Sequence, residues 1–242
     1  MSNLVLELSN VTVKLGKFEL KGIDQDLHPG DIFGVIGRSG AGKSTFIKGL
    51  VGHAKIKSGN IAIKKNGKKK NLLDYLGYSP QENSMYSYLT FDENMNVFAK
   101  LYGINKKVLV ERKKTILKRL DLSREKNKRI RQMSGGMRKR ADLAICLIHN
   151  PDILVLDEPF TGLDISLQEF IWNFLLYLSR EGKIIIISSH NLTDLINNCT
   201  KLGLIHDGRF YSSKQLEKRL MTCGMMKMED YLKKIFDENI NK

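Results

Sequence analysis

The sequence predicts an α/β fold in which helices cover a parallel β-sheet, with an N-terminal antiparallel β subdomain and an inserted α-helical subdomain. From residue 153 onward, the apolar runs ILVL and IIII are separated by a helical pattern, the strand–helix–strand rhythm of a parallel sheet. Apolar residues alternate within 4–35, as in half-buried strands, and residues from about 90 to 150 have helical periodicity. No internal repeat or low-complexity linker interrupts the 242 residues, so we expect one domain over 1–242, with the helical subdomain at about 83–150.

Composition indicates a globular, cytoplasmic protein. Hydrophobic residues make up 42% of the chain, and no apolar run approaches the roughly 20 residues that a membrane-spanning helix needs. The N-terminus lacks the charged start and apolar core of a secretory signal. The cysteines, Cys146, Cys199 and Cys223, are widely spaced and odd in number, which favours reduced thiols over disulfides.

The formal net charge of +14 raises nucleic acid or an anionic membrane as partners. The cations are spread over several runs that polar or apolar residues interrupt. No stacking aromatics alternate with these runs, as they would in a protein that binds single strands. We therefore favour a solvated Lys-rich surface, keep attraction to acidic lipid headgroups as the second interpretation, and expect no specific nucleic acid partner.

The N-terminal segment has the pattern of short strands joined by tight turns. Apolar side chains alternate in two sets: Leu4, Leu6 and Leu8, then Val11, Val13 and Leu15. Pro29-Gly30 predicts a turn before the apolar strand 32–36. Asn66-Gly67 and Asp207-Gly208 are typical of two-residue hairpin turns that need positive φ.

Three helices are predicted between about 90 and 150. Thr90 and Glu93 form a capping box, and Gly103 ends the first helix. The apolar face of that helix is expected to contain Asn94, Val97, Phe98, Leu101 and Tyr102. A second helix is predicted from about Lys106 to Leu120, and a third from Ser134 to a point before Pro151, because the residue before proline disfavours helical geometry.

Residues 37–44, GRSGAGKS, match the phosphate-loop pattern G-x-x-x-x-G-K-[ST]. An apolar strand precedes this loop and a helix from Lys43 through Leu50 follows it, the context in which backbone N–H groups surround a phosphate. Lys43 is expected to reach the β- and γ-phosphates of a nucleotide, and Ser44 to bind Mg²⁺. The sequence thus predicts a P-loop NTPase core.

Two acids end the apolar strand of ILVLDEP, residues 153–159. Carboxylates at the tip of a buried strand need a function, since their burial is unfavourable. We expect Asp157 to hold Mg²⁺ through water and Glu158 to polarise the attacking water as general base.

Three further features are weak when each is taken alone. Gln81 in YSPQENS is typical of a solvated loop, and His190 in IIISSHN of a surface residue at a strand end. His190 nevertheless follows a buried strand at the edge where α/β proteins bind ligands. Ser134, Gly135 and Gly136, in RQMSGGMRKR, could cap a helix, although adjacent glycines are costly to order and suggest a need for bare backbone.

Taken in order, these features resemble the nucleotide-binding domain of an ABC transporter. The set comprises the phosphate loop, Gln81, the Ser134–Gly136 signature within MSGGM, Asp157-Glu158, Gly162-Leu163-Asp164 and His190. The resemblance covers residues 3 to 212 and implies a head-to-tail dimer with two ATP molecules at its interface. Each ATP would lie between the phosphate loop of one subunit and the signature of the other.

The resemblance also implies a role for each motif residue. The residues in contact with ATP would be Gly37, Arg38, Ser39, Gly40, Ala41, Gly42, Lys43, Ser44 and Thr45 from one subunit, and Ser134, Gly135 and Gly136 from the other. Gln81 would bind Mg²⁺ and sense the membrane partner, His190 would contact the γ-phosphate, and Asp164 would lie in the loop that links the two sites. The segments around Gln81 and SGGMRKR are similar to ATPase subunits of ABC-2 type exporters, whose integral-membrane permease is a separate chain.

The chain departs from the family pattern at four positions. Leu15 replaces the usual aromatic residue that stacks on adenine. Either Phe18 stacks on the base instead, or stacking is weak. Loss of one stacking contact would cost about 1–3 kcal/mol of binding free energy. Met133, Met137 and Gly162 also replace commoner residues. None of these changes removes a catalytic group, so hydrolysis of ATP is still expected.

The C-terminal tail, about 213–242, ends in a segment with Met228, Tyr231, Leu232, Ile235 and Phe236 on one helical face. Packing of this helix on its own core is favoured over binding of a partner.

The resemblance therefore implies a cytoplasmic ATPase subunit that powers a permease at the inner face of the membrane. The main alternative is a soluble ABC ATPase without a permease, serving cofactor assembly, translation or DNA maintenance. The chain lacks the tandem domains and the coiled-coil insertion of translation and DNA-repair members. A non-catalytic regulator is disfavoured because Glu158 and His190 are both present.

Overall fold

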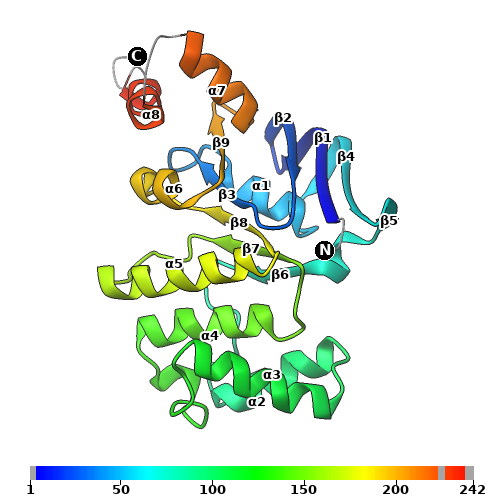
Figure 1. Cartoon of the computed structure of the whole chain (residues 1–242), viewed down its shortest axis with the longest axis vertical. Helices are drawn as coiled ribbons and strands as arrows, with labels where there is room; N and C mark the ends of the chain where they lie inside the picture. The colour runs from blue at the N-terminus through cyan, green and yellow to red at the C-terminus, as the bar shows by residue number, and fades with distance from the viewer. Residues whose placement is uncertain (1–3, 223–226, 238–242) are drawn as a thin grey trace.

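The protein, as a computed structural model that describes residues 4–222 and 227–237, is built on a ten-stranded sheet (Figure 1). The order of strands in this sheet is β5-β4-β1-β2-β10-β9-β3-β8-β7-β6. The strands are β1 (Leu4–Leu15), β2 (Phe18–Leu27), β3 (Ile32–Ile36), β4 (Lys55–Lys65), β5 (Lys68–Lys70), β6 (Leu76–Ser79), β7 (Ile153–Asp157), β8 (Ile184–Ser188), β9 (Lys201–His206) and β10 (Arg209–Tyr211). The helices are α1 (Lys43–Leu50), α2 (Phe91–Leu101), α3 (Lys106–Arg119), α4 (Gly135–Leu147), α5 (Ile165–Arg180), α6 (Leu192–Asn198), α7 (Ser213–Thr222) and α8 (Met228–Asp237), with short 3-10 helices at Leu72–Tyr75 and Ile130–Gln132.

Strands β6, β7, β8, β3 and β9 are mutually parallel, and this half of the sheet positions the site. Val35 of β3 and Asp157 of β7 both pair with Ser188 of β8. Parallel strands end at the same edge of a sheet, so the segments that follow β3, β7 and β8 emerge side by side. The predicted α/β class with a parallel sheet is confirmed.

Successive residues of these strands point into two separate cores. Leu154 and Leu156 pack with the helices α4 and α5, whereas Ile153 and Val155 pack with α1 and the antiparallel strands. Both faces of the parallel sheet are therefore covered, and strands buried on both faces have the continuous apolar sequences seen in ILVL and IIII.

Strands β1, β2 and β4 pair antiparallel, as the N-terminal alternation predicts. The alternation changes phase between Leu8 and Val11 because a β-bulge at Asn10, where φ is 46°, adds a residue to β1. The backbone N–H of Asn10 donates to the Asp24 carboxylate at 3.0 Å, which stabilises the bulge. Both predicted hairpin turns have positive φ at each residue.

Helices α2, α3 and α4 lie between β6 and β7 in the chain and form the lower end of the molecule in Figure 1. The predicted capping box is present, with Thr90 Oγ1 accepting from Glu93 N at 3.2 Å and Glu93 Oε2 accepting from Thr90 N at 2.7 Å. The expected apolar face of α2 is partly wrong. Leu101 is 71% exposed and Tyr102 47% exposed.

Helix α2 instead buries Phe91, Asn94, Met95 and Ala99 against α4 and the core, a stripe rotated from the predicted one. The side-chain amide of Asn94 is satisfied in the core, because its Nδ2 donates to the carbonyl oxygens of Tyr86 at 3.1 Å and Thr90 at 2.9 Å. The first of these hydrogen bonds ties the preceding loop to the helix.

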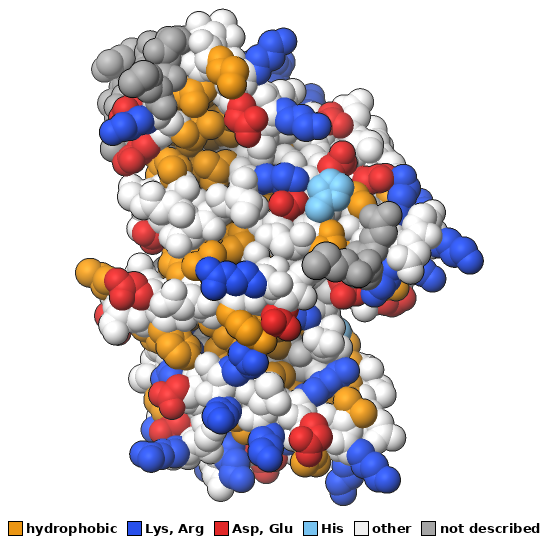
Figure 2. Space-filling view, viewed as in Figure 1, with side chains coloured by type: hydrophobic (Ala, Val, Ile, Leu, Met, Phe, Trp, Pro, Cys, Tyr) orange, Lys and Arg blue, Asp and Glu red, His pale blue; other side chains and the backbone are white. Residues whose placement is uncertain are grey.

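Lysine and arginine side chains are scattered over the visible face, including the helical end, and do not gather in one patch (Figure 2). Several are paired, as Lys113 is with Asp92 at 2.6 Å. This distribution matches the favoured interpretation of a solvated cationic surface on the side shown. No helix among the described residues is long and apolar enough to cross a membrane.

The C-terminal helix α8 packs on the protein itself, beside α6 and α7. Tyr231 and Leu232 are buried in the larger core, and Ile235 packs against it. The predicted packing on the core is confirmed for these residues, whereas residues 238–242 and the side chain of Phe236 lie outside the described part of the chain, as does Cys223. The other two cysteines are free thiols.

We expect Leu232→Ala to destabilise the protein by about 2–4 kcal/mol, because Leu232 is fully buried and its truncation leaves a cavity. Urea unfolding followed by fluorescence of Trp172 measures the effect. Met221→Ala is the control, since Met221 is 80% exposed and its loss should change stability by less than about 0.5 kcal/mol. Equal unfolding midpoints for both variants would contradict the packing of α8 on the core.

Candidate active site

The phosphate loop, residues 37–44, connects β3 to α1 and uses its glycines in different ways. Gly40 and Gly42 have φ of 77° and 118°, a region that favours glycine. A Cβ at Gly42 would lie 2.9 Å from the Phe18 ring, and one at Gly37 would lie 2.8 Å from the Ile205 carbonyl oxygen. A Cβ at Gly40 would meet nothing within 4 Å, so this glycine borders open space.

The N-terminus of α1 is free to bind an anion. Its cap is Gly42, which has no side chain to accept a hydrogen bond from the first turn. The unpaired N–H groups of a helix start, together with the helix dipole, favour a phosphate. Ser44 lies in this first turn and Thr45 follows it. The residues present therefore fit a nucleotide phosphate.

Lys43 is buried and its ammonium group turns back over the loop. Its Nζ donates to the carbonyl oxygens of Gly37 at 2.8 Å and Arg38 at 3.4 Å, and lies 3.8 Å from Glu158 Oε1. These neutral carbonyls can be exchanged for phosphate oxygens, which are stronger partners for an ammonium. The side chain is thus held where an incoming phosphate would meet it.

Asp157, at the end of β7, is buried and accepts a hydrogen bond at 2.5 Å from Ser188 Oγ. The same Ser188 Oγ accepts from the backbone N–H of Glu158 at 3.0 Å. Ser188 therefore positions both acids at once. No group of three or more His, Cys, Asp or Glu side chains forms a metal site within residues 4–222 and 227–237. Mg²⁺ commonly binds through a few protein oxygens, water and substrate phosphates, and Ser44 and Asp157 suit that mode.

Glu158 has φ of 49°, in the left-handed region. The other non-glycine residues with positive φ in the described chain are all Asn or Asp, which tolerate this geometry better. A strained backbone at a polar side chain is typical of a functional position. Glu158 Oε2 lies 2.9 Å from Nδ1 of His190, whose side chain is 68% exposed, so the histidine lies between this partly buried acid and solvent.

Gln81 lies just beyond β6, beside the edge where β7 ends in Asp157. Its side chain is exposed, and its backbone carbonyl accepts a hydrogen bond from Lys139 Nζ of α4 at 3.1 Å. Burial lowers the pKa of Lys139, while the charges of Asp142, Asp157 and Glu158 act in the opposite direction.

Ser134, Gly135 and Gly136 lie apart from the phosphate loop, at the start of α4. Ser134 Oγ caps α4 by accepting from Met137 N at 3.2 Å. A Cβ at Gly135 would meet nothing within 4 Å, whereas one at Gly136 would lie 2.3 Å from Leu167 Cδ2 of α5, so packing also favours glycine at Gly136.

Asp164 caps α5, with Oδ1 accepting from Leu167 N at 2.9 Å. Asp164 follows the acids in the chain and begins the helix whose Leu167 lies beside Gly136 of the signature.

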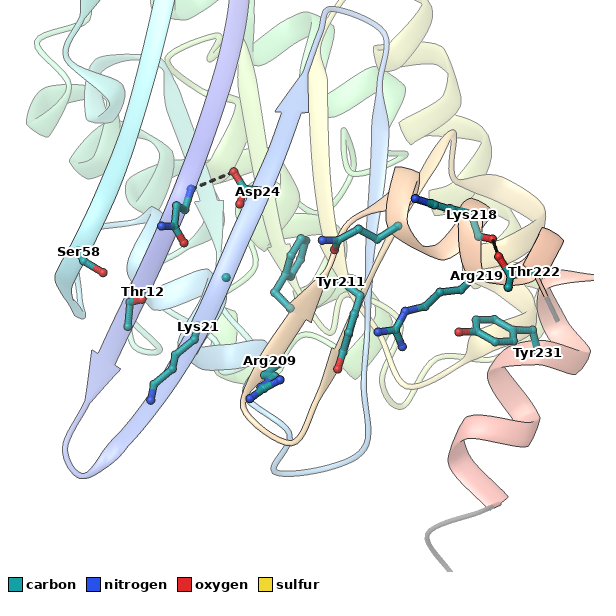
Figure 3. Close-up of a pocket in the computed structure, with 14 residues that line it drawn as sticks. Thr12, Lys21, Asp24, Ser58, Arg209, Tyr211, Lys218, Arg219, Thr222 and Tyr231 are labelled. Atoms are coloured by element: carbon teal, nitrogen blue, oxygen red, sulfur yellow. Dashed lines mark hydrogen bonds between the residues drawn. The ribbon is translucent and has the colours of Figure 1, made fainter.

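A cavity of about 370 Å³ adjoins the phosphate loop and is lined by Phe18, residues 38–41 and residues 205–208. Phe18 is at its rim and is 36% exposed. Another cavity, of about 940 Å³, lies between β1, β2, β10 and the C-terminal helices and contains none of the predicted site residues (Figure 3). The larger cavity therefore lies away from the predicted nucleotide site, whereas the smaller one borders the phosphate loop.

The sequence profile of the ABC transporter family matches residues 20–161, which include the phosphate loop, the signature and both acids. The chain belongs to the ABC transporter family. Members hydrolyse ATP to power transport, so this chain is an ATP-binding ABC ATPase and its ligand is ATP.

Relatives span export proteins and longer transporters. The chain is 32% identical over 213 residues to Nod factor export ATP-binding protein I of Rhizobium sp. (strain N33), covering 86% of this chain and 70% of that protein. It is 32% identical to linearmycin resistance ATP-binding protein LnrL of Bacillus subtilis (strain 168), covering 84% and 67%. It is also 31% identical to ABC transporter G family member 20 of Dictyostelium discoideum, of which it spans only 29%.

A solved ATP-binding subunit of an ABC transporter superposes with a TM-score of 0.80 and covers 95% of this chain and 98% of that one, at 24% identity. The P-loop NTPase fold is thereby confirmed.

Sequence reasoning did not single out Ser188 or Lys139. Ser188 directly precedes the Ser189-His190 pair at the end of an apolar strand, a signal of the same kind as the acids after β7. Lys139 has no comparable signal, because its contact with Gln81 joins residues 58 positions apart.

We expect Ser188→Ala to lower kcat about tenfold with little change in KM for ATP. The loss of a hydrogen bond to a buried carboxylate is worth about 1.5–3 kcal/mol, and both acids would lose their common support. Steady-state ATP hydrolysis measures this. Ser189→Ala is the matched control, because Ser189 Oγ bonds only Asn191 N among the described residues. Unchanged kcat in Ser188→Ala would remove Ser188 from the site.

Proposed function

We propose that this chain is the ATPase subunit of an ABC-2 type exporter, in which two copies close head to tail on two ATP molecules and drive a separate integral-membrane permease. The observation that carries the proposal is the division of the predicted ATP contacts between two separate elements. Residues 37–45 and the acids follow strands of the parallel sheet, whereas Ser134–Gly136 lie at the start of α4. A head-to-tail pair of copies would let one nucleotide meet both sets.

In this proposal Lys43 binds the β- and γ-phosphates, and Ser44, Gln81 and Asp157 hold Mg²⁺, Asp157 through water. Mg²⁺ neutralises charge on the phosphates. Glu158 accepts a proton from a water molecule while the oxygen of that water attacks the γ-phosphorus. The bond between the γ-phosphorus and the bridging oxygen breaks, and its electron pair stays on the ADP oxygen. His190 stabilises the γ-phosphate and, through its 2.9 Å contact, orients Glu158.

The Ser134 hydroxyl and the Gly136 amide of the second copy would complete the phosphate contacts. The start of α4 suits this role because helix N-termini favour anions. Asp164 and the 77%-exposed Ile165 would lie near the interface and link the two sites. ATP-driven closure, and not cleavage itself, would be the step that moves the permease.

A surface for the permease lies next to Gln81. Tyr86 and Tyr88, in the loop that follows Gln81, are 54% and 73% exposed. Tyr86 contacts Phe98 of α2, with ring centroids 6.3 Å apart. Exposed apolar side chains near a nucleotide-sensing loop suit a cytoplasmic segment of a membrane protein. The names of two relatives, one for export and one for drug resistance, support export at the cytoplasmic face of a membrane.

We expect Glu158→Gln to hydrolyse ATP at least about 100-fold more slowly and to accumulate as an ATP-bound dimer, because the general base is lost while binding remains. Sedimentation with and without Mg-ATP detects the dimer. Lys43→Ala is the control and should remain monomeric, since it loses nucleotide affinity. Parent-like hydrolysis by Glu158→Gln would remove Glu158 from its role.

The permease is tested with the same trapped variant. Tagged Glu158→Gln is purified from native membranes solubilised with Mg-ATP, and its partners are identified. A multi-span membrane protein at a ratio near one to one is expected. If only ribosomal, DNA-bound or cofactor-assembly proteins are recovered, the chain is still an ATPase, but the soluble ABC ATPase without a permease replaces the exporter as its function.

A further inference from the structure

The cavity of about 940 Å³ lies on the outer face of the antiparallel strands (Figure 3). Val13 and Leu20 point to the other face of these strands, where they are buried with Phe46 of α1. Thr12 and Lys21, their neighbours in the chain, alternate to the face that lines the cavity. Strand β10 and helices α7 and α8 supply the rest of the wall. The cavity and α1, the helix of the phosphate loop, therefore lie on opposite faces of the same strands.

The charged side chains of this cavity are mostly positive. Those among the described lining residues are Lys21, Arg209, Lys218 and Arg219, with Asp24 as the one acid. Asp24 is already engaged, because its Oδ1 accepts a hydrogen bond from the backbone N–H of Asn10 at 3.0 Å. A cleft lined by one sign of charge concentrates the electrostatic potential and attracts ions of the opposite sign. The cavity therefore suits an anion.

Two of these cations are neighbours on adjacent strands. Arg209 of β10 is the register partner of Lys21 of β2, so both side chains leave the same face of the sheet. Like charges in this position repel and lower stability. Lys21 lies 3.6 Å from Glu19, but that carboxylate is closer to Lys57, at 2.5 Å. Arg209 is exposed and forms no ion pair within the described part of the chain. An anion bound between the two cations would relieve their repulsion.

A third cation reaches the cavity from the C-terminal helices. Arg219 of α7 extends toward Tyr211 of β10, with its guanidinium carbon 4.5 Å from the ring centroid, and Tyr231 of α8 lies beside it (Figure 3). Stacking occupies one face of the guanidinium and fixes its plane, whereas the N–H groups at its edges stay available. A planar guanidinium held in this way is ready to donate two parallel hydrogen bonds to one anion.

A phosphate group is the anion that fits these cations best. It carries up to two negative charges and several acceptor oxygens, and arginine binds it through two hydrogen bonds at once. The volume of the cavity is within the range of small-molecule sites and leaves room for the group that bears the phosphate. Hydroxyl and aromatic side chains line the remainder, among them Thr12, Ser58 and Tyr211. The cavity thus fits a phosphate ester.

We propose that this cavity binds a small molecule with a phosphate ester, whose phosphate is held by Lys21 and Arg209 from the sheet and by Arg219 from α7. The inference does not depend on the proposed function, because none of these residues belongs to the predicted ATP site. The ligand bridges β10 and α7, and so holds the C-terminal helices against the sheet. A soluble metabolite and a lipid headgroup offer the same phosphate chemistry.

The first test uses the full chain with Lys43→Ala, which weakens the phosphate loop as a competing site. Inorganic pyrophosphate is the probe, and isothermal titration calorimetry measures its affinity. We expect binding that Arg209→Met and Arg219→Met each weaken at least about tenfold, because each removes charge-assisted hydrogen bonds. Arg124→Met is the matched control, since Arg124 is exposed in the helical subdomain, and it should change the affinity less than about twofold.

Thermal unfolding provides a second readout. Without the probe, it verifies that each variant is folded. With pyrophosphate, the Tm of the parent and of Arg124→Met should rise, because a ligand that binds the folded state stabilises it. The Tm of the two cavity variants should rise less at the same concentration.

A further arm identifies the source of the phosphate. Vesicles of phosphatidylcholine with phosphatidic acid are compared with vesicles of phosphatidylcholine alone, and glycerol phosphate is the soluble probe. Sedimentation with the vesicles that needs both phosphatidic acid and the two arginines assigns the ligand to a lipid headgroup. Binding of glycerol phosphate without vesicle binding assigns it to a soluble ester. Either result supports the site.

Two results would overturn the inference. One is no measurable binding of pyrophosphate by the parent. The other is an equal loss of affinity in Arg124→Met and in both cavity variants, because binding would then be a general attraction to a cationic surface. Neither result affects the ATP-bound dimer of Glu158→Gln, so the proposed function would stand.

Discussion

The parallel pairing of β3, β8 and β7 is the constraint on which the site depends. Val35 and Asp157 flank Ser188 in neighbouring strands, so the segments that follow the three strands leave the sheet at one edge. Lys43, Glu158 and His190 meet there only because this register holds. The polar residues at the strand ends depend on this register, since a slip of one residue would separate Asp157 from Ser188 and break the hydrogen bond between their side chains.

The charged side chains at this edge need partners, because burial of an unpaired charge is unfavourable. Asp157 is buried with one hydroxyl donor, and Glu158 lies between an ammonium and an imidazole. Lys43 is in turn supported by loop carbonyls that a phosphate can replace. Groups of both signs are thus held close together by the fold, which is the preorganisation that the proposed phosphoryl transfer requires.

The fold class and the order of the motifs could be predicted from the sequence because each depends on local pattern. The capping box at Thr90, the hairpin turns and the buried strands all follow from residues close in the chain. The contact of Lys139 with Gln81 could not be predicted, because it depends on how α4 packs against β6. The buried stripe of α2 was also misplaced, since Leu101 and Tyr102 fit the helical period but Phe91 and Met95 face the core. Roles at Gln81, Ser134 and Asp164 rest on family resemblance and remain predictions.

The antiparallel strands serve a different purpose on each face. Val13 and Leu20 are buried in the core with α1, whereas their neighbours Thr12 and Lys21 face the cavity, where a charge does not disturb the core. Helix α7 begins two residues after β10 ends, so the chain returns over the sheet and brings Arg219 to the same cavity. Repulsion among the cations opposes the packing of α7 on the sheet, and an anion between them would replace that repulsion with attraction. The attachment of the C-terminal helices would then depend on the concentration of the ligand, because a ligand that binds only the folded arrangement stabilises it by mass action.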